Sequence, residues 1–384
     1  MGVSCSRFLK AKGDSPLCEP FTESWLPAVA CVVCCNVLGC GVGGGGGGGG
    51  NVSINVSASA TTVQAGATTS VSATVMHAGG NPAVTWTLTG STCPTHCGVL
   101  SGTGNSQTYT APDFVPAGFM VTATATAVAD TSKSASLVLT ITHSLSVTCP
   151  SGHEGELNGQ YAFLMGGGGS AGGIQIAGSI TADGAGNITV GLEDINSKAS
   201  GPQTGFSIPS GQSLYTVGSD NRGCLGLVDS NHTIYIYRFG LASFSAGIAA
   251  SGRVIEFDDT TGNGTRMEGF LAQQDAASFN SGLQGSYVFG LTGGDSSGGR
   301  YSSAGVCTAS AGAFTNGNLD SDDARALVTN AAGIGGTYKV SLSGRGTTTL
   351  NSQNFVLYMI SGRPVPGPGH GCTRRHPSPA ERPV

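Results

Sequence analysis

Two serine residues of this chain stand in the G-x-S-x-G pattern that carries the nucleophile of many hydrolases. They are Ser170, in Gly-Gly-Ser-Ala-Gly, and Ser296, in Gly-Asp-Ser-Ser-Gly. A nucleophile elbow needs a strand before the serine and a helix after it, so that a sharp turn holds the hydroxyl. Both serines lie instead in glycine-rich segments between stretches of alternating residues, which are typical of turns. We therefore interpret both matches as turns between strands.

Carboxylate residues form three clusters, and a pair of carboxylates supplies the acid and base of most glycoside hydrolases. The clusters are Glu193-Asp194, Asp258-Asp259 and the trio Asp320, Asp322 and Asp323. Adjacent residues of a strand point to opposite faces of the sheet. Neither adjacent pair therefore has the geometry that a catalytic pair requires.

The segment after Asp258 offers a second chemistry, which is calcium binding. Four residues partly match a calcium-binding loop: Asp259, Thr261, Asn263 and Gly264. Phe270, however, stands where the closing Glu of such a loop belongs. We expect a solvated hairpin turn over Asp258–Asn263 and no bound metal.

Aromatic residues alternate with isoleucines in the segment TIYIYRF, which begins at Thr233. The alternation places Tyr235, Tyr237 and Phe239 on one face of a strand. Such a face could stack against sugar rings, or it could pack in a core. Core packing is the favoured interpretation.

Composition limits the partners and cofactors of the chain. Only 10% of the 384 residues are charged, 64 are glycine, and the net charge is −5. The chain therefore has no basic field to attract phosphates, and we expect no nucleic-acid partner. The seven histidines form no metal-binding motif of the HExxH kind, and we expect no cofactor. A hydrophobic content of 39% is enough to build folded cores.

The N-terminal region has the pattern of an export signal. An uncharged apolar run extends from Trp25 to Cys40, with basic residues before it and a run of glycines, Gly43–Gly50, after it. The run is shorter than a membrane-spanning helix and suits a signal-peptide core. Its end, Val-Leu-Gly-Cys, resembles a bacterial lipoprotein signal, which implies a lipid on Cys40. An uncleaved membrane anchor is the alternative.

We accordingly predict a leader over 1–40 and a flexible glycine-rich linker over 41–50. Acidic residues lie between the basic residues and the apolar run, so we expect the true start of the protein downstream of Met1. The lipid would hold the protein at the outer membrane or the cell surface.

Residues 51–142 read as one β-sandwich. Short alternating runs rich in Val, Thr and Ser recur with turns between them, as in FMVTATATAV from Phe119. This alternation places Val121, Ala123, Ala125 and Ala127 on one face and the threonines on the other. About seven short strands in this length is typical of immunoglobulin-like sandwiches. Trp86 is the expected buried core tryptophan.

The order AVTWTLTG, CGVLSGTG, TYTAP and VTATATAV resembles a bacterial Ig-like domain of group 2, over nearly the whole segment. The resemblance implies a structural or adhesive module without catalytic residues. It also implies a short loop disulfide between Cys93 and Cys97. Metal binding there would need another ligand beside His96 and the two cysteines, and none is nearby in the sequence. Pairing among the remaining cysteines stays open: Cys149, Cys224, Cys307 and Cys372.

The rest of the chain contains an internal duplication. LNGQYAF from Leu157 matches LQGSYVF from Leu283, and Tyr215 with its following residues matches Tyr338 with its own. We predict two copies, over 155–275 and 283–362, each an antiparallel β-meander that forms a barrel or a sandwich. The second copy has no counterpart of Gly252–Gln273, and the Pro-rich segment 363–384 cannot supply strands. We expect copy two to be incomplete, with a strand edge near Tyr358 and a disordered tail over 363–384.

The sequence thus predicts an all-β envelope protein with structural or adhesive function and no catalytic activity. Its expected partners are the membrane, through the lipid, and surface glycans or other envelope proteins. One alternative is a secreted carbohydrate or ester hydrolase that uses Asp258, Asp259, Glu193 or a loop serine. A carrier of small apolar ligands is another.

Overall fold

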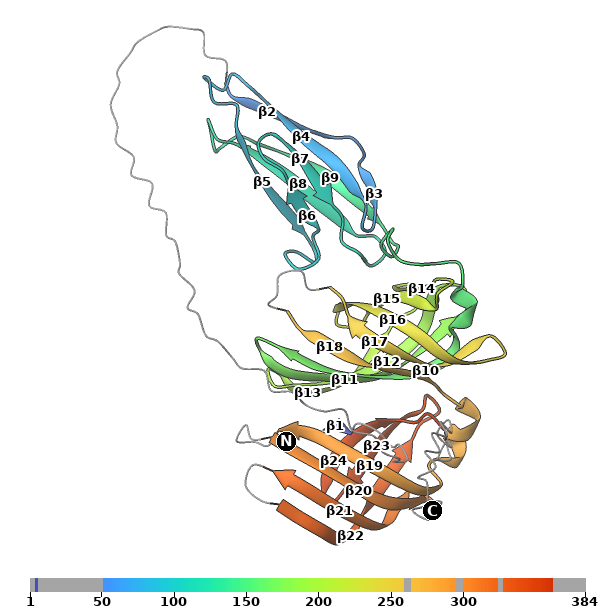
Figure 1. The fold of residues 1–384 in the computed structure, drawn as a ribbon. Coiled ribbons are helices and arrows are strands. Elements are labelled where there is room, and N and C mark those ends of the chain that lie inside the picture. Colours follow the sequence, from blue (N-terminus) through green and yellow to red (C-terminus); the bar gives the residue numbers. More distant parts are fainter. Residues whose placement is uncertain (1–3, 6–50, 259–263, 295–299, 324–326, 362–384) are drawn as a thin grey trace, which may run out of the picture.

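The structure is a computed structural model that describes residues 4–5, 51–258, 264–294, 300–323 and 327–361. These residues form strands β1–β24 and two short 3-10 helices, η1 (Glu154–Glu156) and η2 (Ala276–Ser281). The predicted all-β class is confirmed. Figure 1 shows three β bodies stacked one after another: a sandwich, a closed barrel and an open half-barrel. The predicted leader, the glycine linker and the tail 363–384 lie outside the described residues, apart from Ser4 and Cys5.

The first body is a sandwich of two four-stranded sheets. One sheet has the order β2 (Ser53–Ala58), β4 (Thr68–Met76), β7 (Ser106–Thr110), β6 (Val99–Ser101). The other has the order β3 (Thr62–Gln64), β9 (Ser134–Thr142), β8 (Met120–Ala127), β5 (Val84–Gly90). As the alternation predicted, Val121, Ala123, Ala125 and Ala127 of β8 are fully buried between the sheets. Trp86 packs against this core but stays half-buried, and Tyr109 is the aromatic residue at its centre.

The second body is a closed barrel of eight strands, in which every strand pairs antiparallel with its neighbours. Its order is β10 (Asn158–Gly169), β11 (Gly172–Asp183), β12 (Asn187–Ser197), β14 (Ser213–Val217), β15 (Arg222–Val228), β16 (Ile234–Ser245), β17 (Ile248–Glu256) and β18 (Arg266–Gln273). The barrel closes where β18 pairs with β10. A ninth strand, β13 (Gly201–Ile208), pairs with the later part of β12, from Gly191 to Ser197, whereas β14 pairs with the start of β12.

The third body is an open sheet that follows the order of the chain. It comprises β19 (Gly285–Gly294), β20 (Arg300–Ser310), β21 (Ala313–Asp323), β22 (Leu327–Val340), β23 (Arg345–Leu350) and β24 (Gln353–Tyr358). The N-terminal strand β1 (Ser4–Cys5) pairs with the free edge of β19. Apolar side chains from these strands pack on the inner face of the curved sheet.

The barrel and the half-barrel share side-chain details as well as strand order. The Tyr215 hydroxyl donates a hydrogen bond to the Leu157 carbonyl at 2.7 Å, and the Tyr338 hydroxyl donates to the Leu283 carbonyl at 2.6 Å. In both bodies a phenylalanine ring also lies over a glycine of the adjacent strand. A Cβ atom at Gly178 would meet the ring of Phe163, and one at Gly305 would meet the ring of Phe289. These paired contacts are what a duplicated sequence produces.

Candidate functional site

The carboxylate pair Glu193-Asp194 is divided between the inside and the outside of the barrel. Glu193 pairs across the sheet with Gly178, whose inner face lies beneath the ring of Phe163, so its side chain points into the barrel. Asp194 points outward, toward the half-barrel, where Arg345 contacts it. The sequence-based expectation that this pair cannot act as one acid–base unit agrees with this geometry.

Glu193 instead belongs to an acidic and phenolic cluster inside the barrel. Asp229 follows the end of β15, Tyr235 and Tyr237 project inward from β16, and Glu256 lies opposite Tyr237 on β17. The two tyrosine rings stack with their centroids 5.9 Å apart. We call these five residues the interior acidic cluster. It was not predicted from the sequence, because its members are far apart in the chain.

The hydrogen bonds of the interior acidic cluster are incomplete. One Asp229 oxygen accepts from the backbone N–H groups of Asn231 at 2.9 Å and Thr233 at 2.7 Å. Within the described part of the chain, no donor reaches either Glu193 carboxyl oxygen, the second Asp229 oxygen or the Tyr237 hydroxyl. The group that faces Glu193 is the Asp229 carboxyl. Two carboxyl groups are stable side by side only when one of them holds a proton.

The environment of Glu193 favours its protonated form. Burial and, to a smaller extent, the neighbouring Asp229 carboxyl group together raise the pKa of Glu193 from 4.5 to about 8. Burial also raises the pKa of Tyr237 well above its ordinary value, with an added contribution from the charge of Glu193. At neutral pH Glu193 therefore keeps its proton.

The chemistry that this cluster can perform is limited by its enclosure. Glu193 has 0% and Asp229 1% of its surface exposed, so neither carboxyl can touch a solute in this conformation. Among the described residues, no three His, Cys, Asp or Glu side chains are placed to hold a metal ion. The cluster is best described as a proton-holding element of the barrel core.

The other residues predicted to do chemistry are not brought together. Ser170 lies at the exposed turn between β10 and β11, in the hairpin geometry expected of a turn. Asp258 follows β17 and accepts from the Ile236 backbone N–H at 3.4 Å. Ser296, Asp259 and most of the calcium-like loop lie outside the described residues. Asp320 and Asp322 are exposed on β21 of the half-barrel.

The aromatic face of β16 packs in the core, as predicted. Tyr235, Tyr237 and Phe239 belong to the buried cluster inside the barrel, so they form no exposed platform for sugars. The isoleucines between them face outward and pack under the sandwich. Both faces of this strand are therefore used for packing.

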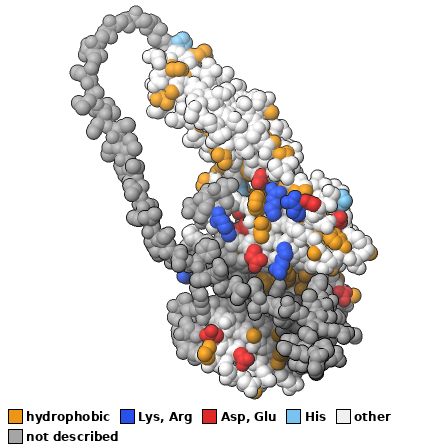
Figure 2. Space-filling view, in the orientation of Figure 1, with side chains coloured by type: hydrophobic (Ala, Val, Ile, Leu, Met, Phe, Trp, Pro, Cys, Tyr) orange, Lys and Arg blue, Asp and Glu red, His pale blue; other side chains and the backbone are white. Residues whose placement is uncertain are grey.

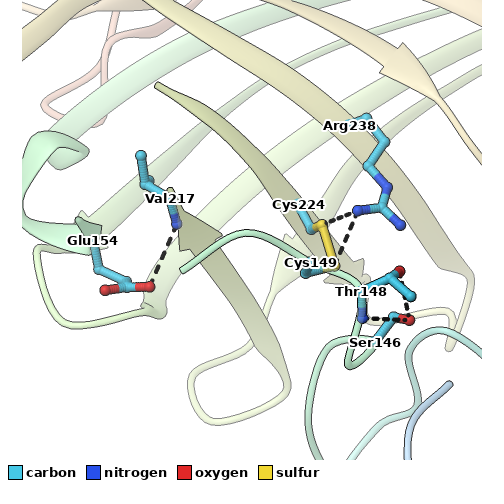
Figure 3. Close-up of a disulfide and its surroundings, with 7 residues drawn as sticks. All are labelled: Ser146, Thr148, Cys149, Glu154, Val217, Cys224 and Arg238. Atoms are coloured by element: carbon cyan, nitrogen blue, oxygen red, sulfur yellow. Dashed lines mark hydrogen bonds between the residues drawn. A yellow bond between two sulfur atoms is a disulfide. The ribbon is translucent and has the colours of Figure 1, made fainter. Parts of the chain in front are cut away.

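Two cysteine pairs are joined. Cys93 and Cys97 lie 4.9 Å apart between Cα atoms and are bonded, which is the pairing that the Ig-like resemblance implied. Cys149 and Cys224 are bonded across 75 residues of sequence, with Cα atoms 5.9 Å apart. Figure 3 shows that the Arg238 guanidinium lies against this second disulfide, 3.2 Å from the Cys149 sulfur. Cys307 is a buried free thiol.

This second disulfide lies where the sandwich meets the barrel. Cys149 belongs to the connection after the sandwich, and Cys224 is on the outer face of β15. Phe114 of the sandwich packs on the same barrel face, directly over Gly226, where a Cβ atom would lie 2.5 Å from the ring. The junction is therefore both cross-linked and packed.

A second junction joins the barrel to the half-barrel through Asp194. The Arg345 guanidinium donates two hydrogen bonds to its carboxylate, at 2.8 and 2.7 Å, and the Tyr358 hydroxyl donates a third, at 2.5 Å. The Gln274 side chain reinforces this contact by donating to the Met359 carbonyl at 2.6 Å. Sequence reasoning identified Asp194 but missed both of its partners. Arg345 stands seven residues after Tyr338, as Arg222 stands seven residues after Tyr215, so the sequence repeat makes the two arginines equivalent.

Comparisons with known proteins give no family for this chain. No family model matches it, and no curated protein is similar to it in sequence. Among the described residues, no helix has the length and apolar character needed to cross a membrane.

Proposed function

We propose that this protein is a lipid-anchored, non-catalytic component of a bacterial envelope that presents binding surfaces on stacked β modules. The observation that carries the proposal is the filled barrel interior. Large side chains such as Tyr161, Met165 and Tyr237 are almost completely buried there. An eight-stranded barrel is just wide enough for side chains to fill. A barrel of this kind acts through its outer surface and its edges.

The two junctions support a role as a stiff support. A disulfide and the Phe114 contact hold the sandwich on the barrel, and the Asp194 contacts hold the half-barrel on the other side. Figure 2 shows few charged side chains on the visible face of the sandwich, whereas charged side chains gather over the barrel. The sandwich, with few charges, would then act as a spacer, and the more highly charged barrel would hold a binding surface away from the membrane.

The membrane part of the proposal is supported by the Val-Leu-Gly-Cys sequence that ends at Cys40 and by the glycine run that follows. Labelling of cells with radioactive palmitate tests it. We expect label in the wild-type protein and none in the Cys40→Ser variant. A wild-type protein without label would show that the anchor is wrong, even if the modules fold as described.

The absence of catalysis is tested separately. A panel of glycan and ester substrates is offered to the purified full chain and to its Asp258→Asn and Ser170→Ala variants. We expect no turnover above the background of a heat-denatured sample. Turnover that disappears in either variant would establish a hydrolase.

A further inference from the structure

The disulfide at the junction of the sandwich and the barrel joins a half-buried cysteine to a fully buried one. Cys149 lies in the connection after the sandwich and is half-buried. Cys224, on the outer face of β15, has 0% of its surface exposed. The rate and the course of thiol–disulfide exchange depend on which sulfur an incoming thiolate can reach. A thiol that approaches from solvent therefore meets Cys149 first.

The register of the barrel places the Arg238 guanidinium beside both sulfurs. Arg238 lies directly opposite Cys224 in the pairing of β15 with β16, so the two side chains share the outer face of the sheet. The guanidinium Nη1 donates to the Cys224 sulfur and also to the Cys149 sulfur, the latter at 3.2 Å (Figure 3). The centroid of the Phe257 ring lies 5.1 Å from the guanidinium carbon, a cation–π contact that helps to fix the charge at the disulfide.

A guanidinium at this place stabilises a thiolate more than it stabilises an intact disulfide. Divalent sulfur is a weak hydrogen-bond acceptor, whereas a hydrogen bond between two charged groups is strong. The guanidinium of arginine stays protonated in proteins. A neighbouring positive charge lowers the pKa of a thiol, and a thiol of lower pKa is the faster leaving group in exchange. Arg238 therefore favours the departure of Cys224, the buried partner, when Cys149 is attacked.

We infer that the Cys149–Cys224 disulfide is an exchange site for small thiols, at which a thiolate attacks Cys149 and Arg238 stabilises the departing Cys224 thiolate. The thiolate forms a bond to the Cys149 sulfur, the bond between the protein sulfurs breaks, and its electron pair goes to Cys224. A second small thiol then attacks the first one, forms a small-molecule disulfide and releases Cys149. Two small thiols are oxidised, the protein disulfide is reduced, and the two protons of the small thiols pass to the two cysteines.

Contacts beside the disulfide keep the two cysteines close together after it has opened. Pro150, the residue after Cys149, lies against Gly218, where a Cβ atom would be 2.4 Å from the proline side chain. The His153 backbone N–H donates to the Val217 carbonyl at 2.9 Å. These contacts hold the connection on the barrel without the sulfurs. The disulfide therefore forms again when an oxidised small thiol is supplied, and the cross-link at this junction is reversible and sensitive to redox conditions.

Reduction of the oxidised full chain by reduced glutathione tests the inference. Samples are quenched with N-ethylmaleimide at intervals, and peptide mapping by mass spectrometry follows each disulfide separately. We expect the rate of opening of Cys149–Cys224 to rise with the glutathione concentration, and early samples to carry glutathione on Cys149 and N-ethylmaleimide on Cys224. Arg238→Gln should slow the reaction about ten-fold, because a hydrogen bond to the charged leaving group is lost. Arg238→Lys keeps the charge and should recover part of the rate.

Two controls make the result specific to Arg238. Arg222→Gln removes another arginine near the disulfide, one that pairs with Asp220 at the surface, and should leave the rate unchanged. The Cys93–Cys97 disulfide is the control within each sample. Burial lowers the pKa of His96, the histidine in its loop, so this ring is uncharged at neutral pH. We expect this disulfide to open at the same rate in the wild type and in all three variants.

Three results would overturn the inference. The first is that glutathione leaves the wild-type Cys149–Cys224 disulfide intact, or opens it at a rate that does not depend on the glutathione concentration. In the latter case the disulfide would react only after the protein had opened. The second is a glutathione adduct on Cys224 in place of Cys149. The third is a rate for Arg238→Gln that equals or exceeds that of the wild type.

Discussion

At the scale of single residues, the buried carboxyl group of Glu193 makes the stability of the barrel depend on pH. It is a carboxyl group with no exposed surface and a pKa of about 8. In the unfolded chain it ionises near pH 4.5, whereas in the barrel it keeps its proton to about pH 8. Its contribution to stability is therefore complete below pH 4.5 and is lost as the pH rises through 8.

This titration gives a measurable prediction. Between pH 5 and 8 the free energy of unfolding of the wild type should fall relative to that of Glu193→Gln, by up to about 1.4 kcal/mol per pH unit. Glutamine resembles the protonated carboxyl and cannot ionise. Urea unfolding at a series of pH values measures the difference, and Glu268→Gln, which removes an exposed carboxyl from β18, is the control. If the free energies of unfolding of Glu193→Gln and the wild type change with pH in parallel, Glu193 ionises in the barrel at the same pH as in the unfolded chain, which would contradict the prediction.

At the scale of elements, the Cys149–Cys224 disulfide ties the connection after the sandwich to strand β15. It closes a loop of 75 residues, and cross-links of this length stabilise the folded state by roughly 4 kcal/mol in the chain-entropy model. We expect the Cys149→Ala/Cys224→Ala double variant to lower the melting temperature of the barrel in calorimetry without reductant. The Cys93→Ala/Cys97→Ala variant removes a disulfide whose cysteines are only four residues apart in the sequence. This variant should lower the melting temperature much less. Equal losses in the two variants would contradict this assignment.

Element patterns were the part of the fold that the sequence could predict. Alternation in β8 and β16 identified the buried faces, because a period of two fixes which side chains share a face. The duplication predicted that copy two lacks counterparts of β17 and β18, and none is found among the described residues. The closed ring could not be predicted, since closure depends on β10 meeting β18 across more than 100 residues of chain. The contact between Asp229 and Glu193 could not be predicted for the same reason. A strand pattern gives the face on which a residue lies but not its partner across a barrel.

At the scale of the whole molecule, the Asp194–Arg345 pair couples the barrel to the half-barrel. Removal of one partner from a buried ion pair typically costs about 3–5 kcal/mol, and the side chains here are 7% and 21% exposed. We expect Asp194→Ala to let the two bodies separate, which broadens the distance distribution in small-angle X-ray scattering. Arg222 occupies the matching repeat position and pairs with Asp220 at the surface. Arg222→Ala should leave the scattering unchanged, and an unchanged profile for Asp194→Ala would contradict the coupling.

One sequence repeat forms a closed barrel in its first copy and, among the described residues, an incomplete barrel in its second. Hydrogen exchange on the full chain tests this directly, because each copy is the internal control of the other. The strands β14–β16, within residues 213–238, belong to a closed ring, whereas their counterparts within 336–360 end at β24, which is the last strand of its sheet in the described part of the chain. Slower exchange in 213–238 than in 336–360 is the predicted result. Equal protection of the two segments would contradict this difference between the copies, because the second copy would then be as stable as the closed barrel.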